Sequence, residues 1–379
     1  MTVTDVANGA LVLEDGRLFF GQLRGATPAD AAAGEVVFHT GMTGYPEIIT
    51  DPSYCGQIVT LTAPHIGNVG MPAGDDESGG AQVAGLIVRK LCRTRSGARA
   101  SIDLEEYLRQ QGIRCLEGID TRALTRHLRI QGAVRGRITP LPENRTNLRA
   151  WLRETLGEVK KQDAMVGAEL VSRVGARDLR HLPAYGGGGR GHFALLDMGS
   201  KLSIAEELRQ RGCDISIVPH DASLEDILAL KPDALMLSNG PGDPAACLHP
   251  IGVVRQLLGK MPIVGICLGH QILALAAGAK SYKLPFGHHG ANHPVQDVST
   301  GSVAITSQNH GFSIDESSLR GTSFNVSHRS LYDGTVEGIR SLGLRAMSVQ
   351  YHPEAAPGPH DALAIFDEFL RQWGRRNAA

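Results

Sequence analysis

The most reactive arrangement in this sequence is a single cysteine, Cys267, with Gly265 and Gly269 two residues away on either side. An apolar run at 262–266 predicts a buried strand before it, and a run of small and apolar residues at 271–277 predicts a helix after it. This glycine spacing permits a sharp strand-to-helix turn that leaves the residue at its apex strained and exposed. Backbone N–H groups at the start of a helix favour a thiolate. The segment therefore predicts a cysteine nucleophile and covalent catalysis.

A partner that could transfer protons to and from this thiol lies near the end of the chain. Of the 15 histidines, His352 stands out because it follows a predicted strand at 345–349 and precedes Pro353 and Glu354. In an extended segment, residues two apart point the same way, so the carboxylate would orient the imidazole. The alternative is a surface histidine with a carboxylate nearby by chance. Only the combination with Cys267 favours the catalytic interpretation.

A third candidate is the loop at 238–244, Ser-Asn-Gly-Pro-Gly-Asp-Pro, which follows another predicted strand. Two glycines and two prolines favour a rigid turn with exposed backbone N–H groups. Acyl transfer needs such donors to stabilise the oxyanion of a tetrahedral intermediate. The N–H of Leu268, directly after the nucleophile, would be the second donor. An ordinary strand-to-helix loop remains the alternative.

The elements expected to position these residues alternate from residue 192 onward. Predicted strands lie at 193–197, 214–218 and 234–238, and predicted helices lie at 201–211, 224–230 and 251–258. This order predicts an α/β domain with a mostly parallel sheet and helices on both faces. Such sheets place active sites at the carboxyl ends of their strands, where Cys267 and the loop at 238–244 lie.

The first part of the chain predicts a strand-rich α+β domain. Its expected elements are a hairpin at 11–20, strands at 35–38, 57–61 and 83–88, and helices at 103–111, 121–130 and 144–156. The glycine-rich stretch at 184–191 is typical of a flexible linker. We therefore expect domains at 1–150 and 192–379, joined by a connecting segment at 151–191.

Bulk properties narrow the class of protein. The chain has 379 residues, and 38 Lys and Arg balance 39 Asp and Glu, which does not indicate binding to nucleic acid or to a membrane. Six scattered cysteines without a C-x-x-C pair argue against structural zinc and disulfides. The sequence shows no secretory signal, no apolar run long enough to span a membrane and no phosphate-binding loop of the G-x-x-x-x-G-K-[ST] type. We expect a cytoplasmic protein.

Together, the turn at 265–271, the loop at 238–244 and the His-Pro-Glu ending at 352–354 resemble the class I, triad-type glutamine amidotransferase domain. This resemblance implies that Cys267 is the nucleophile, His352 the general acid and base, and Glu354 the carboxylate that orients it. The likeness extends to the carbamoyl-phosphate synthase small-subunit family, through segments at 35–38, 41–45, 50–54, 64–68, 118–122, 286–290, 292–295 and 308–312. The stretch at 197–204 departs from the family's D-F-G-x-K-x-x-I pattern by placing Met198 where Phe is usual.

The resemblance implies a glutaminase subunit that forms a γ-glutamyl thioester on Cys267. It would deliver ammonia to a large subunit that makes carbamoyl phosphate from bicarbonate and ATP, for arginine or pyrimidine biosynthesis or both. The implied L-glutamine-binding residues are Ser53, Gly240, Gly242, Leu268, Gln271, Asn309, Gly311 and Phe312. No metal or cofactor is implied in this chain, because ATP and Mg belong to the partner. Another class I amidotransferase, a γ-glutamyl hydrolase and a non-catalytic scaffold subunit remain as alternatives.

Overall fold

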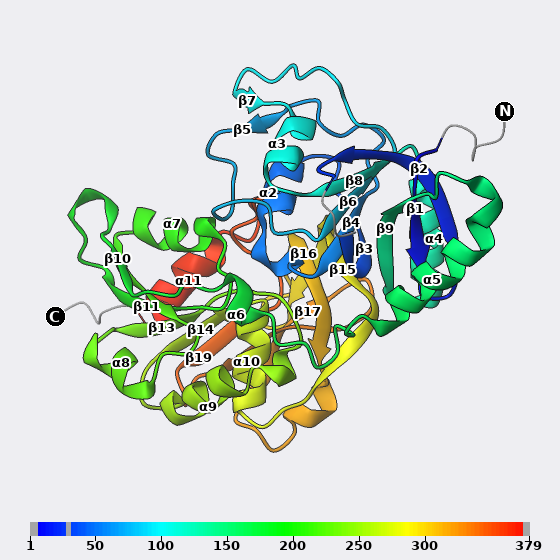
Figure 1. Cartoon of the computed structure of the whole chain (residues 1–379). Helices are drawn as coiled ribbons and strands as arrows, with labels where there is room; N and C mark the ends of the chain where they lie inside the picture. The colour runs from blue at the N-terminus through cyan, green and yellow to red at the C-terminus, as the bar shows by residue number, and fades with distance from the viewer. Residues whose placement is uncertain (1–6, 28–31, 374–379) are drawn as a thin grey trace. The chain divides into compact units, whose positions relative to one another are not determined.

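The structure is a computed structural model that describes residues 7–27 and 32–373 (Figure 1). The chain divides into two compact units. The first comprises Met1–Met165 with Pro285–His289, and the second comprises Val166–Leu284 with Gly290–Ala379.

The first unit is built on a closed barrel. Its strands, in barrel order, are β1 (Gly9–Leu13), β2 (Leu18–Gly25), β8 (Arg114–Glu117), β6 (Gly85–Val88), β4 (Gln57–Leu61), β3 (Ala32–His39) and β9 (Val134–Pro140). Strands β1 and β2 form the predicted hairpin, whose turn contains Gly16 at φ 87°. A left-handed backbone of this kind favours glycine. Closure leaves no free sheet edge, and apolar side chains such as Leu11, Val36 and Ile58 fill the core.

Helices and one short ribbon complete the first unit. The helices are α2 (Tyr45–Thr50), α3 (Leu104–Gln110), α4 (Thr121–Gln131) and α5 (Leu148–Lys161), and the ribbon pairs β5 (Met71–Pro72) with β7 (Ala100–Ile102). Helix α4 begins where the sequence predicts, because the Asp120 side chain accepts a hydrogen bond from the Ala123 N–H at 2.9 Å. The strand-rich α+β character expected for this part of the chain is confirmed.

The second unit contains a ten-stranded sheet in the described part of the chain. Its strands, in order across the sheet, are β10 (Arg180–Leu182), β12 (Cys213–Pro219), β11 (Gly191–Asp197), β13 (Ala234–Leu237), β14 (Ile263–Ile266), β19 (Ala346–Val349), β18 (Val336–Ser341), β17 (Asn325–Ser330), β15 (Ser281–Asp297) and β16 (Val303–Ile314). The five strands from β12 to β19 are parallel neighbours, as predicted. Strands β17 and β18 pair antiparallel beyond them, an extension that was not predicted from the sequence.

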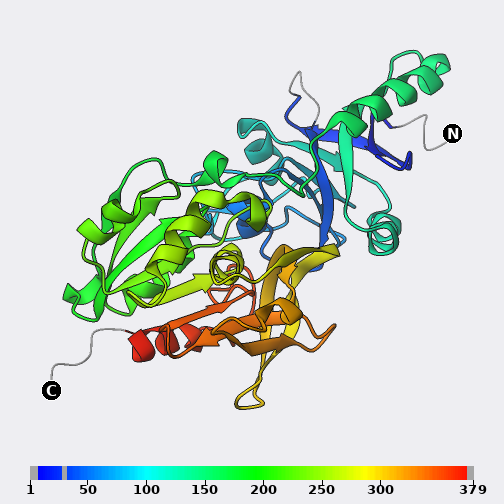
Figure 2. The same ribbon diagram turned by 90° about the horizontal axis from the view of Figure 1, so that it is seen from below.

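Helices cover both faces of the parallel part of this sheet (Figures 1 and 2). The helices of the second unit are α6 (Val171–Val174), α7 (Leu202–Gln210), α8 (Leu224–Ala229), α9 (Leu248–Leu257), α10 (Leu268–Ala276) and α11 (Ala364–Trp373). Alternate strand residues point to opposite faces, so Leu235 and Leu237 pack with α9 and α10 whereas Met236 packs with α7 and α11. The predicted α/β architecture is confirmed.

The connecting segment expected at 151–191 does not form one linker. Residues up to Met165, including helix α5, belong to the first unit, and the segment from Val166 onward belongs to the second. There, β10 pairs with the edge of the sheet, the Ala184 N–H donates to Asp214 Oδ1 at 2.9 Å, and the Arg209 guanidinium lies 4.2 Å from the centre of the Tyr185 ring. The glycine composition alone suggested a flexible linker, but the residues around the glycines hold the stretch against the second unit.

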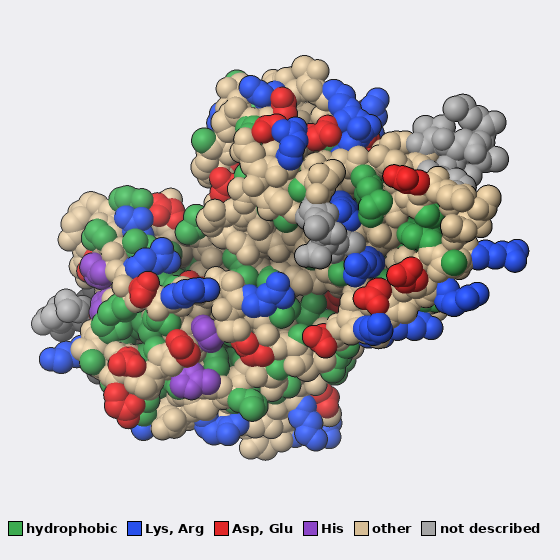
Figure 3. Space-filling view, viewed as in Figure 1, with side chains coloured by type: hydrophobic (Ala, Val, Ile, Leu, Met, Phe, Trp, Pro, Cys, Tyr) green, Lys and Arg blue, Asp and Glu red, His purple; other side chains and the backbone are tan. Residues whose placement is uncertain are grey.

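The visible surface carries charges of both signs. On the face shown in Figure 3, Lys and Arg side chains are interspersed with Asp and Glu side chains, consistent with the near-zero net charge. Within residues 7–27 and 32–373, no helix has the length and apolar character needed to cross a bilayer.

Candidate active site

Cys267 lies at the turn between β14 and α10, as the glycine spacing predicts. Its backbone has φ 54° and ψ −105°, a sparsely populated conformation for a residue with a side chain. The turn brings the backbone very close to its neighbours at both glycines, which is possible because glycine has no Cβ. A Cβ on Gly265 would lie 2.7 Å from the Gly269 carbonyl carbon, and a Cβ on Gly269 would lie 2.3 Å from the Leu237 carbonyl oxygen.

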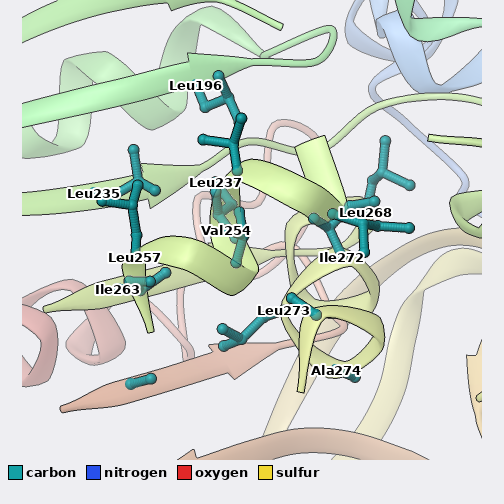
Figure 4. Packing of buried hydrophobic residues seen from close by; sticks show 14 of the residues in the cluster. Leu196, Leu235, Leu237, Val254, Leu257, Ile263, Leu268, Ile272, Leu273 and Ala274 are labelled. Atoms are coloured by element: carbon teal, nitrogen blue, oxygen red, sulfur yellow. The ribbon is translucent and has the colours of Figure 1, made fainter. Parts of the chain in front are cut away.

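Packing and hydrogen bonds hold this turn in place. The Cys267 N–H donates to the Val349 carbonyl at 2.9 Å, and the Sγ atom lies 3.6 Å from the Asn309 carbonyl oxygen. Figure 4 shows the apolar side of α10, where Leu268 and Ile272 pack among the buried residues of neighbouring elements. Because Leu268 is buried in this core, its backbone N–H is the group that it can offer to a substrate.

His352 and Glu354 form a buried pair. The Nδ1 atom of His352 lies 2.7 Å from Oε1 of Glu354, and both side chains are almost fully buried. The sequence predicts an extended segment here, but the structure has a turn. In this turn the Ala355 N–H donates to the His352 carbonyl at 3.2 Å. The turn, rather than strand alternation, brings the two side chains together. Because Nδ1 is taken by Glu354, Nε2 of His352 is the nitrogen left for the thiol.

Lys201 is a third charged member of this group, and its part in it was not predicted from the sequence. Its Nζ atom lies 2.9 Å from Glu354 Oε1 and donates to the Ala355 carbonyl at 2.6 Å, with only 2% of the side chain exposed. The lysine follows the carboxyl end of β11, on the same sheet edge as Cys267. This position after a strand was the sequence signal that could have placed Lys201 near the site, but lysines are mostly exposed to solvent.

Electrostatics in this group favour a charged pair. Burial alone would raise the pKa of Glu354, but the charges of Lys201 and His352 outweigh burial and hold it well below its usual value. Burial alone would lower the pKa of His352, but the charge of Glu354 and the nearby Cys267 sulfur outweigh it and hold the pKa well above its usual value. These charges therefore favour the protonated form of the imidazole.

The predicted glutamine-binding residues of the second unit lie on three elements. Gly240 and Gly242 follow β13, Leu268 and Gln271 lie on α10, and Asn309, Gly311 and Phe312 lie on β16. The Gln271 amide nitrogen donates to the Phe312 carbonyl at 2.9 Å, which links α10 to β16. A Cβ on Gly240 would lie 2.8 Å from the Leu268 side chain, which places the loop after β13 against the start of α10.

Ser53 belongs to the first unit, where it lies in a short turn at Pro52–Tyr54. Its backbone N–H donates to Asp51 Oδ1 at 2.8 Å. Its part in glutamine binding remains a prediction.

The buried histidines near Cys267 differ from His352. His270 lies next to Ser348 Oγ at 2.9 Å, and burial lowers its pKa to about 3, so it is neutral at physiological pH. Nδ1 of His310 lies 2.8 Å from the Phe312 carbonyl oxygen. The His270 imidazole thus bonds to the neighbouring strand β19, whereas the His310 imidazole bonds within its own strand, β16.

Comparison with known proteins first defines the class. Residues 194–372 match the family model described as glutamine amidotransferase class-I, which covers β13, Cys267 and His352. Residues 11–138 match the model described as carbamoyl-phosphate synthase small chain, CPSase domain.

Relatives over nearly the full length then define the family. The carbamoyl phosphate synthase small chain of Bacillus caldolyticus is 49% identical and aligns over 95% of each chain. The small chain of Bacillus thuringiensis subsp. konkukian and the pyrimidine-specific small chain of Bacillus subtilis are each 47% identical, over 95% of this chain and 94% of theirs. The chain belongs to the carbamoyl phosphate synthase small-chain family, as the resemblance in its sequence implied.

Proposed function

We propose that this chain hydrolyses L-glutamine through a γ-glutamyl thioester on Cys267 and delivers the ammonia to a large subunit. The observation that carries this proposal is Cys267 on a strained turn, electrostatically coupled to a buried His352–Glu354 pair. The family name, small chain, supports a larger partner that completes the synthase.

In the proposed first half-reaction, the Cys267 thiolate attacks the side-chain amide carbon of glutamine. The backbone N–H groups of Leu268 and of the Gly240 loop stabilise the oxyanion. Protonated His352 gives its proton to the leaving nitrogen as the carbon–nitrogen bond breaks, so ammonia departs and the thioester remains.

In the second half-reaction, neutral His352 takes a proton from water, and the resulting hydroxide attacks the thioester. The carbon–sulfur bond then breaks, which releases glutamate and regenerates the Cys267 thiolate. Glu354 stays ionised throughout and stabilises the imidazolium, and Lys201 in turn stabilises the carboxylate.

The partner reaction forms the rest of the proposal. The large subunit would bind ATP and Mg and combine ammonia with bicarbonate to give carbamoyl phosphate, in the cytoplasm. We infer that the product enters pyrimidine biosynthesis, arginine biosynthesis or both. The name of the Bacillus subtilis relative, a pyrimidine-specific small chain, supports the first route.

The test uses the complex of this chain with a large subunit, ATP and bicarbonate. Cys267→Ser should abolish carbamoyl phosphate synthesis from glutamine but leave synthesis from ammonia intact. Cys92→Ser, at a partly buried free cysteine of the first unit, is the matched control and should leave both activities unchanged. Loss of both activities in Cys267→Ser would show that the role assigned to Cys267 is wrong.

The same assay separates the alternatives. Glutamine hydrolysis by the wild-type chain that does not respond to the partner would favour a γ-glutamyl hydrolase or an amidotransferase for another synthase. Absence of hydrolysis with and without the partner would favour a scaffold subunit.

A further inference from the structure

A segment at 167–176, which we call the strap, follows the first unit in the chain and bonds to the loop after β13. Glu169 and Gly242 form an antiparallel bridge, and the Asp243 N–H donates to the Ala168 carbonyl at 2.9 Å. In return, the Gly167 N–H donates to Asp243 Oδ2 at 2.8 Å. The strap therefore holds the far side of the loop that contains the two glycines predicted to bind glutamine.

Asp243 is the side chain that joins the two segments. It is 6% exposed, and both of its carboxylate oxygens accept hydrogen bonds from backbone N–H groups. Oδ2 accepts from Gly167 in the strap, and Oδ1 accepts from Ala245 at 2.9 Å in the turn that follows the loop. A carboxylate that accepts two N–H bonds from different segments fixes both of them, because each bond to a charged acceptor is stronger than a neutral one.

Close backbone approach makes this junction rigid. Gly242 has φ 91°, and a Cβ there would lie 2.6 Å from the Ala168 carbonyl oxygen. The other end of the strap is also anchored, because Val171 is 1% exposed and belongs to the same core cluster as Leu268. The Ala176 N–H donates to Asp197 Oδ2 at 3.2 Å, at the carboxyl end of β11.

The loop leads from this junction to the nucleophile. Three residues before Asp243, Gly240 lies against the Leu268 side chain, and Leu268 follows Cys267 directly. A shift of the loop on its strap side would move the Gly240 backbone relative to the start of α10. Displacements of about 1 Å in a catalytic geometry can cost on the order of a hundredfold in rate.

We propose that Asp243 is a positioning residue for glutamine hydrolysis, an inference that rests on the proposed function. Its carboxylate ties the loop to the strap and so holds the Gly240 and Gly242 backbones in the orientation that glutamine and its oxyanion require. Asp243 acts through the loop and does not itself contact the substrate.

The test compares Asp243→Asn with wild type in the full-length chain. The amide keeps the size of the side chain but has one acceptor oxygen, so either Gly167 or Ala245 loses its acceptor. We expect kcat/KM for glutamine to fall by about tenfold, the effect of one lost hydrogen bond to a charged group. The rate at which iodoacetamide alkylates Cys267 should stay unchanged, because the His352–Glu354 pair is not touched.

Asp315→Asn is the matched control. The Asp315 carboxylate also accepts from a backbone N–H in a turn of the second unit, that of Ser317 at 2.9 Å, but has no contact with the loop. It should leave kcat/KM unchanged. Hydrogen exchange of the amides at 240–246 adds a readout independent of activity, and only Asp243→Asn should accelerate it.

Three outcomes would overturn the inference: unchanged kcat/KM in Asp243→Asn, unchanged exchange at 240–246, or parallel loss of alkylation and thermal stability, which would indicate general unfolding. A wild-type chain without glutaminase activity would refute the proposed function instead. In that case the exchange measurement still decides whether Asp243 positions the loop.

Discussion

Replacing Gly269 with alanine should displace Cys267, the proposed nucleophile, without removing any reactive group. An added Cβ would lie 2.3 Å from the Leu237 carbonyl oxygen and 2.7 Å from its carbon, whereas ordinary contacts begin at 3.4 Å. The first turn of α10 must therefore move by about 1 Å, since a backbone carbonyl in a central strand cannot rotate away. Cys267 precedes this turn by one residue and must move with it.

The size of the effect follows from that displacement. Overpacking of this kind costs roughly 1–3 kcal/mol in the free energy of unfolding, which lowers the melting temperature by about 5 °C. A misplacement of about 1 Å between nucleophile and substrate lowers the rate on the order of a hundredfold. We expect Gly269→Ala to fold, to melt a few degrees early, and to lose nearly all glutaminase activity.

Gly252→Ala provides the matched control. Gly252 lies within α9, and a Cβ there meets no atom within 4 Å. The substitution should leave activity unchanged and raise the free energy of unfolding by up to about 1 kcal/mol, because alanine favours helix. Steady-state glutamine hydrolysis and thermal melts of the three proteins give the comparison. Wild-type activity and melting temperature in Gly269→Ala would refute the reasoning, since close packing against Leu237 would then not fix the nucleophile.

The remaining predictions concern the histidines and their charges. His352→Asn should lower kcat for glutamine by about 10²-fold or more without changing the circular dichroism spectrum, and near-normal turnover would mean that another base serves Cys267. Glu354→Gln should lower the pKa of His352, because it removes a charge that raises it, and an unchanged imidazole titration by NMR would contradict this. Burial lowers the pKa of His270 to about 3 and that of His328 to about 4. Below pH 6.5 these two histidines therefore bind more protons in the unfolded chain than in the folded chain. As the pH is lowered from 6.5, the free energy of unfolding measured in urea should therefore decrease by about 1.4 kcal/mol per pH unit for each of the two histidines. His328→Phe should remove the contribution of one histidine and so halve that slope.

Local sequence signals were sufficient to predict the strand, turn and helix around Cys267. The strand, the glycine spacing and the helix that position Cys267 lie within a few residues of one another, so their pattern predicts the turn directly. The same holds for the hairpin at Gly16 and for the start of α4 at Asp120, where one residue determines the local backbone. Each of these features depends on neighbours in sequence.

Features that depend on distant contacts could not be predicted in this way. Barrel closure pairs β1 with β9, more than a hundred residues later, and no local pattern specifies that partner. The conformation of the glycine-rich stretch depends on Asp214 and Arg209, which hold it from other elements. The turn at His352 also differs from the extended segment assumed, because the hydrogen bond of Ala355 closes it.

Lys201 shows why the contacts around His352 and Glu354 could not be predicted from the sequence. Its buried Nζ atom donates to the Glu354 carboxylate and to the Ala355 carbonyl oxygen, and burying an ammonium without such partners would be costly. The Lys201 N–H also donates to Asn239 Oδ1 at 2.9 Å, and Asn239 directly precedes Gly240. One pair of neighbouring loops thus fixes both the charge partner of Glu354 and the backbone predicted to bind the oxyanion. Movement of either loop would disturb the proposed proton transfer and the proposed oxyanion binding together, because both depend on the same edge of the sheet.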